Sequence, residues 1–389
     1  AHAARAFAQL GAHAQREHRV LDADQAWQGA LRNLDDGAAP YAHALIGRAR
    51  ARYRLQRVNE ALADLARSLE IAQAVGDAGL QLEALLEQAT ALDWTQDFTS
   101  SRGVAEAAIR HYQRDPQRHA SFSIDVEFAA ARIAFREQEP GAEVQLRDVV
   151  ARARAAGNLG AEIDAAVLLG CVLVGQGCLD EAEAVLDRTI AMCEESGDRF
   201  HLGAAYNNRT LLWSARGEIE RVAGDLRVVI QLAREAGQAF VERAATWNLA
   251  EDRLWQGALD EALLLGRRSL ALQQGHGEGS TRLDEMLLAR IYAARGQRSE
   301  LATTLAAVTL HALDDDERRL AAVLQASIAD EGLAAWDRAL DDAKALPPPY
   351  QLEMLHLAAR QGGLSPERRE YLRTLAEADP IWSRRLAEL

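Results

Sequence analysis

The sequence predicts an all-α protein in which helices are stacked as repeated hairpins. Glycines recur at a spacing of twenty residues, and a glycine directly after the last turn of a helix takes the left-handed conformation at no steric cost. These glycines are Gly157, Gly177, Gly197, Gly217, Gly237, Gly257 and Gly277, with Gly296 one residue short of the next position. No proline occurs from Gly141 to Leu346, so continuous helical hairpins are expected there.

The composition agrees with close packing of helices. Aromatic residues make up 5% of the chain, and alanine and leucine dominate, which disfavours a sheet. A single core of 389 residues would be unusually large, whereas a stack of hairpins grows without enlarging any one core. The net charge of −14 argues against the basic face that a phosphate-backbone binder needs, so we expect no nucleic-acid partner.

Two helices of this length make a unit of about forty residues, and the units share one register. Early in each second helix, one position is small or apolar: Ala23, Ala61, Ser101, Ala142, Ala182, Val222, Ala262 and Leu301. The positions four and seven residues later are mostly apolar too, which places all three on one buried helix face. Twelve residues earlier, in the first helix, stand small residues that allow close approach of two backbones: Gly11, Ala49, Ala89, Ala130, Gly170, Thr210, Ala250 and Ala289.

This register resembles that of the tetratricopeptide repeat family. The residues that carry the resemblance are Leu10-Gly11 followed by Ala23, Trp27 and Ala30, and Leu169-Gly170 followed by Ala182 and Leu186. The resemblance covers residues 3–311 with eight units that are longer than the usual unit of about 34 residues. Such long units look like the repeats of kinesin light chains and of bacterial regulators. The resemblance implies a right-handed α-solenoid of helical hairpins.

The chain is expected to have three parts. Residues 1–313 form a solenoid of about eight repeats, residues 314–346 a degenerate ninth hairpin, and residues 347–389 a helical cap, which terminal units of solenoids need. An acidic first turn starts the ninth hairpin at Asp314, and its second helix runs from Gly332 to Leu346. Three prolines end that helix, and cap helices are expected near Gln351–Gln361 and Pro366–Ala378.

No pattern typical of catalysis appears. We cannot name a nucleophile, a base and oxyanion donors that converge, so we expect no enzyme. The cysteines Cys171, Cys178 and Cys193 lack metal-ligand spacing, and the histidines lack a His-Glu-x-x-His pattern. His201, near a helix start, is expected to be exposed. We expect no metal and no cofactor. No apolar stretch has the length of a membrane span, which together with the unpaired cysteines predicts a cytoplasmic protein that does not insert into membranes.

The resemblance implies a binding surface on the first helices, which line the inner surface of the superhelix in that family. The ligand-contacting positions of the sixth to eighth repeats hold Asn207, Asn208, Trp247, Asn248, Glu251, Trp255, Met286 and Arg290. An asparagine amide offers a donor and an acceptor to an extended peptide. The structural alternative is that Asn208 and Asn248 bond neighbouring helices while Trp247 packs internally. A second, weaker cluster is Arg50, Tyr53, Glu87, Asp93 and Trp94.

The function expected from this resemblance is a protein–protein interaction scaffold or docking module of a bacterial signalling or regulatory protein. It would bind a protein or peptide segment on the inner face. The alternative is a ligand-gated sensor for a small peptide or another signal molecule. The chain also resembles repeat regions found behind Ser/Thr kinase or ATPase domains, and it begins with Ala1 rather than Met. We therefore expect a covalent link to such an upstream domain.

Overall fold

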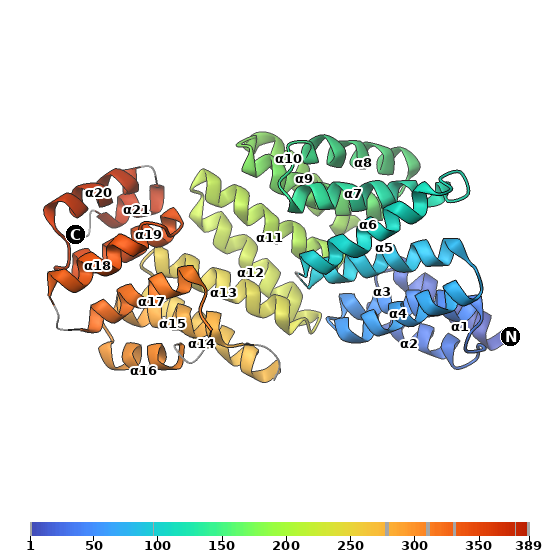
Figure 1. The fold of residues 1–389 in the computed structure, drawn as a ribbon, viewed down its shortest axis with the longest axis horizontal. Coiled ribbons are helices and arrows are strands. Elements are labelled where there is room, and N and C mark those ends of the chain that lie inside the picture. Colours follow the sequence, from blue (N-terminus) through green and yellow to red (C-terminus); the bar gives the residue numbers. More distant parts are fainter. Residues whose placement is uncertain are drawn as a thin grey trace. The chain divides into compact units, whose positions relative to one another are not determined.

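A computed structural model describes residues 2–95, 97–276, 280–308, 312–329, 332–377 and 379–386. These residues form helices and turns and contain no β-strand, which confirms the predicted all-α class. Figure 1 shows the helices in chain order, and the contacts divide the chain into two compact units. The first contains residues 1–216 and 235–238, and the second contains residues 217–234 and 239–389. We describe each unit by itself.

The first unit contains five helical hairpins and the first helix of a sixth. The first helices of these hairpins are α1 (His2–Arg16), α3 (Ala39–Arg54), α5 (Ala78–Trp94), α7 (Ser123–Arg136), α9 (Leu159–Gly175) and α11 (Arg199–Arg216). The second helices are α2 (Val20–Leu31), α4 (Val58–Ala74), α6 (Phe98–Gln113), α8 (Ala142–Ala156) and α10 (Leu179–Ser196). A short 3-10 helix, η1 (Ala120–Phe122), precedes α7.

Each first helix packs on the next first helix, from α1 through α11, and each second helix packs between its own first helix and the following one. The small residues of the predicted register make this packing possible. A Cβ atom added to Gly170 would lie 2.5 Å from Leu186, and one added to Gly11 would lie 2.7 Å from Trp27. Ala23, predicted to be buried, is fully enclosed. The first helices therefore form a continuous layer.

The turn glycines confirm the predicted spacing. Six members of the set, from Gly157 to Gly257, have φ between 67° and 81°, and Gly296 has φ 71°. Gly277 lies outside the described residues. Three turns of the first four hairpins use a residue with a side chain in the left-handed conformation instead, namely His18, Gln56 and Gln138 with φ 52°, 63° and 56°.

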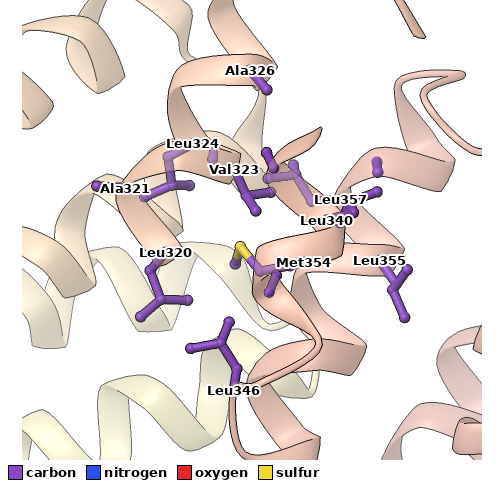
Figure 2. Packing of buried hydrophobic residues seen from close by; sticks show 14 of the residues in the cluster. Leu320, Ala321, Val323, Leu324, Ala326, Leu340, Leu346, Met354, Leu355 and Leu357 are labelled. Carbon is purple, nitrogen blue, oxygen red and sulfur yellow. The ribbon is translucent and has the colours of Figure 1, made fainter. Parts of the chain in front are cut away.

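The second unit continues the hairpins and ends in additional helices. Its helices are α12 (Ile219–Glu235, whose last residue belongs to the first unit), α13 (Ala239–Trp255), α14 (Leu259–His276), α15 (Arg282–Arg295), α16 (Arg298–Val308), α17 (Asp315–Ile328), α18 (Leu333–Ala343), α19 (Pro348–Arg360), α20 (Pro366–Glu377) and α21 (Pro380–Leu386). Figure 2 shows how α17, α18 and α19 share one apolar cluster, in which Met354 of α19 lies near Leu320 and Val323 of α17.

Two features of the C-terminal helices differ from the expectation. Helix α19 begins at Pro348 rather than near Gln351, because a proline fits the first turn of a helix, where its missing N–H group is not needed. Helix α21 was not predicted. Its Arg385 donates hydrogen bonds to the carbonyl oxygens of Leu254 and Trp255 at 3.2 and 2.9 Å, which satisfies the C-terminal end of α13.

Candidate functional site

Charged side chains gather on the layer of first helices in the first unit. Arg50 of α3 contacts two carboxylates of α5, since its Nη2 lies 2.8 Å from Glu83 and its Nε lies 2.8 Å from Glu87. Tyr53, one turn further along α3, is buried beside Glu87. Burial opposes the charge on Arg50, but the two carboxylates outweigh it and raise the pKa of the guanidinium. This arginine therefore stays charged and fixes α3 against α5.

His201 at the start of α11 lies between two carboxylates. Its Nδ1 is 2.6 Å from Asp198 and its Nε2 is 2.7 Å from Asp164 of α9. Burial alone would lower the pKa of the imidazole, but Asp164 and Asp198 raise it to about 9. His201 is thus a buried imidazolium at neutral pH. The expectation that it is exposed was wrong, because a helix start is accessible only when no neighbouring helix covers it.

An aromatic cluster joins distant hairpins of the first unit. The ring of Phe200 on α11 lies 4.3 Å from that of Trp94 on α5 and 6.5 Å from that of Tyr53 on α3, measured between ring centroids. On the same side, the side-chain amide of Gln238 donates to the carbonyl oxygen of Arg54 at 2.8 Å. Hairpins two and three therefore meet the sixth through their first helices, so the first helices form the inner face of this unit.

Two charged groups on α7 lack an oppositely charged hydrogen-bond partner. No described residue donates a hydrogen bond to the carboxylate of Asp125 or forms an ion pair with it. Burial, followed by the charge of Glu87, raises the pKa of Asp125 to about 6. Arg132 is buried and donates to the hydroxyl of Thr90 at 3.1 Å. Burial lowers the pKa of Arg132, and no carboxylate among the described residues contacts it.

The structure places the predicted residues of the sixth repeat in the first unit. Asn207 and Asn208 lie on α11 and are half-buried. The Asn208 amide donates to the carbonyl oxygen of Val167 on α9 at 3.3 Å, as in the structural alternative. The weaker cluster of Arg50, Tyr53, Glu87, Asp93 and Trp94 is brought together here on α3 and α5.

The other predicted residues lie in the second unit, and most of them make internal contacts. Arg290 of α15 is buried and contacts Glu251 of α13 at 2.5 Å and Glu353 of α19 at 2.5 Å. The indole N–H of Trp255 donates to Glu353 at 2.7 Å, and Tyr350 lies over the Arg290 guanidinium at 4.8 Å from the ring centroid. Helix α19 therefore contacts Arg290 and Trp255, which the repeat register predicts to contact a binding partner.

Three further predicted residues differ in exposure. Met286 is buried in the apolar cluster of the C-terminal helices. Trp247 is half-buried and donates to the carbonyl oxygen of Leu283 at 3.2 Å, whereas Asn248 is exposed. Thus Asn248 and part of Trp247 remain accessible on α13.

Sequence reasoning did not find four charged site residues of the first unit, namely His201, Asp198, Asp164 and Asp125. Asp164 and Asp125 occupy the first helices of the fifth and fourth hairpins, whereas the predicted binding residues lie in the sixth to eighth repeats. The aspartate three residues before His201 was the available signal, since its carboxylate also accepts from the His201 backbone N–H at 3.2 Å.

No protein-family model and no curated protein matches the sequence. Solved structures do match. The apo form of RapI is 11% identical with a TM-score of 0.64, covering 89% of this chain and 98% of that chain. A Rap protein in complex with competence and sporulation factor is 10% identical with a TM-score of 0.58, covering 96% and 99%.

A third solved structure is a signal transduction ATPase with numerous domains from Pyrococcus horikoshii, which has a tetratricopeptide repeat sensor. It is 12% identical with a TM-score of 0.58, covering 90% of this chain and 54% of that chain. At these identities the similarity establishes the fold, which is a tetratricopeptide-like solenoid of helical hairpins. Among the described residues, no helix combines the length and hydropathy needed to cross a membrane.

Proposed function

We propose that this chain is a non-catalytic interaction module of a cytoplasmic bacterial regulatory protein and that it binds an extended protein or peptide segment. In the first unit the contact surface is the inner face, and in the second unit Trp247 and Asn248 form a separate contact surface. Similarity in fold to a Rap protein bound to competence and sporulation factor, and to the repeat sensor of a signal transduction ATPase, supports a regulatory role. An upstream kinase or ATPase domain remains part of this proposal.

The observation that carries the proposal is the unpaired carboxylate of Asp125. Burial and the like charge of Glu87 raise the pKa of Asp125, and Arg50, whose charge opposes this, is paired with Glu83 and Glu87. A cation that approaches a carboxylate in such surroundings stabilises its charged form. A lysine, an arginine or an N-terminal amine of a bound segment would supply that charge.

Asn207 and Asn208 lie on α11 of the same layer as Asp125. Amide side chains at such positions hydrogen-bond an extended backbone, which has no helix to satisfy its own polar groups. In the second unit, we assign Glu251, Trp255, Met286 and Arg290 to holding α19, since that helix already occupies them. The partner is therefore expected to touch Trp247 and Asn248 on α13 and leave the buried ion pairs intact.

A random heptapeptide library displayed on phage tests the proposal. The immobilised protein should enrich peptides that contain lysine or arginine. Asp125→Asn should lose this preference, while Asp148→Asn, which changes an exposed residue of α8, should keep it. Failure of the wild-type protein to enrich any sequence, or an unchanged preference in Asp125→Asn, would contradict the proposed function.

The enriched peptide then tests the asparagines. Asn208→Ala and Asn248→Ala together should weaken its affinity several-fold, because each lost hydrogen bond is worth roughly 0.5–1.5 kcal/mol. Unchanged affinity places the binding surface elsewhere. Since Asn208 also bonds Val167, a fall in melting temperature assigns Asn208 to the structural role instead.

A ligand-gated sensor is the second proposal. The contacts of Phe200 in the sixth hairpin with Trp94 and Tyr53 in the third and second favour the sensor. A ligand that binds between hairpins joined in this way can alter their spacing. A small molecule that copurifies and raises the melting temperature without a protein partner would select this reading.

A further inference from the structure

A cavity of about 320 Å³ opens in the first unit at a different place from Asp125. The turn between α1 and α2 and the end of α3 form one side of it. The start of α11 and residues 235–238 form the other. Its apolar lining includes Val20, Leu21, Leu55 and Phe200. All these segments belong to the first unit.

The carboxylates that line the cavity already have cationic partners. Asp22 lies 3.0 Å from Arg19, and Glu235 pairs with Arg199. Asp198 accepts from His201 at 2.6 Å. Each acidic group of the lining is thus in contact with a basic group. The lining contains a further cation that none of them contacts, although the charge of Asp198 attracts it through space.

Arg54 is that further cation. Its guanidinium donates no hydrogen bond to a described residue and forms no ion pair with one, and its Nε is fully enclosed. The guanidinium carbon lies 5.7 Å from the centroid of the Phe200 ring. The Nδ1 atom of His18 is also enclosed without a hydrogen-bond partner, at 3.6 Å from Asp198. A buried charged donor without an acceptor is costly, so Arg54 requires an acceptor. The neutral ring of His18 can supply a second hydrogen bond to the same group.

We propose that this cavity binds a small organic anion. Its carboxylate or phosphate group lies on Arg54 and His18, and its apolar part lies against Phe200 and Leu55. A guanidinium presents donors in a planar fork that matches two oxygens of such a group. The volume lies at the lower end of the range for ligand pockets, which limits the ligand to about the size of one ring with a short substituent.

This proposal does not depend on peptide binding to the inner face. The ligand would bridge the first and second hairpins to the sixth, because the residues that receive it come from the α1–α2 turn, α3 and α11. Binding should therefore raise the melting temperature of the protein as well as release heat.

Isothermal titration with four probes tests the proposal. Phenyl phosphate and benzoate represent the two oxyanions, benzamide is the neutral counterpart, and inorganic phosphate lacks the apolar part. We expect at least one aromatic anion to bind, and to bind at least tenfold more tightly than benzamide and inorganic phosphate. Absence of binding by both aromatic anions would overturn the proposal, as would equal binding of benzamide. If inorganic phosphate binds as tightly as the aromatic anions, the proposed contact of the ligand with Phe200 and Leu55 would be wrong.

The matched variants are Arg54→Gln and Arg67→Gln. Arg67 is exposed on α4 and pairs with Glu70 at 3.0 Å, outside the cavity. Arg54→Gln should weaken the aromatic anion at least tenfold, and Arg67→Gln should leave it unchanged. Arg54→Gln removes the contact with the Phe200 ring and the attraction of nearby carboxylates but no hydrogen bond, so it should lower the melting temperature of the free protein by at most a few degrees. If Arg54→Gln does unfold the protein, Arg54→Lys is the second variant. Lysine keeps the positive charge but lacks the planar set of guanidinium donors, so it should still weaken binding several-fold. Unchanged affinity in either folded Arg54 variant would refute the assignment.

Discussion

The Nε2 atom of His201 lies 2.7 Å from a carboxylate oxygen of Asp164, which joins α11 to α9 through a buried ion pair. Because Asp198 holds the other ring nitrogen, both nitrogens of this imidazole are donors and the ring is charged at neutral pH. A buried cation of this kind makes stability depend on pH in a defined direction.

Stability should fall as the pH rises through the titration of His201. The pKa of His201 is about 9 in the folded protein, above the ordinary 6.5, so its contribution is fully present below about pH 6.5 and is lost as the pH rises through about 9. The loss is on the order of 3 kcal/mol. Urea unfolding of the wild type at pH 6 and pH 9.5 measures it. His201→Gln should flatten this difference, whereas His13→Gln on the exposed side of α1 should preserve it.

Asp125→Asn should stabilise the protein at pH 7. The folded-state pKa of this carboxyl group is about 6, above its ordinary 3.8, so ionisation costs free energy that the amide does not incur. Since the side chain is partly exposed, we expect a gain of only about 1–2 kcal/mol. The gain should be mostly lost by pH 4 and absent below the unfolded-state pKa of 3.8, where the carboxyl group is protonated in both states. Asp148→Asn should change stability by less than about 0.5 kcal/mol at both values. A destabilised Asp125→Asn protein at pH 7 would refute this account.

Glu353→Ala should destabilise the protein by roughly 3–5 kcal/mol, because it leaves the buried Arg290 without one of its two carboxylates and removes the acceptor of the Trp255 indole. Denaturant unfolding followed by circular dichroism measures this change. Glu370→Ala is the control, since Glu370 pairs with Arg373 on the surface and such pairs contribute about 1 kcal/mol or less. Similar losses in both variants would mean that α19 is not held by the buried network.

Gly47→Ala should be strongly destabilising, although alanine normally favours a helix. A Cβ atom at this position of α3 would lie 2.4 Å from the Trp27 ring, which is itself 3% exposed and has no room to move. We expect a cost of about 1–3 kcal/mol. Gly103→Ala within α6 meets no atom within 4 Å and should gain about 0.5–1 kcal/mol from helix propensity. Melting temperatures of the two variants should therefore shift in opposite directions.

The repeat architecture could be predicted because its determinants are local. The glycine after each helix and the small residue opposite a large one, as with Gly170 and Leu186, act within one hairpin. The internal contacts of the predicted site could not be foreseen in the same way. Glu353 reaches Arg290 from α19, which lies outside the repeat register, so the register alone left Arg290 open to a partner.

Contacts between distant hairpins of the first unit were harder to predict for a related reason. His18 of the first hairpin contacts Asp198 just before the sixth, and Phe200 of the sixth contacts Tyr53 of the second. These contacts join the two ends of the first unit, and neither local segment indicates them. Helix α21 was missed because seven residues give too short a periodic pattern, and its docking depends on Arg385 finding the end of α13.

Closure of the first unit also bears on how it comes apart. Stacked repeats usually contact only their neighbours, so they can fray from an end one hairpin at a time. Here Asp198 contacts His18 of the first hairpin, and Gln238 donates a hydrogen bond to the carbonyl oxygen of Arg54 in the second. Loss of the first hairpin would therefore also break contacts with the sixth. Amide hydrogens of α1 and α11 should exchange at similar rates, as members of one cooperative block rather than as a mobile end and a stable middle.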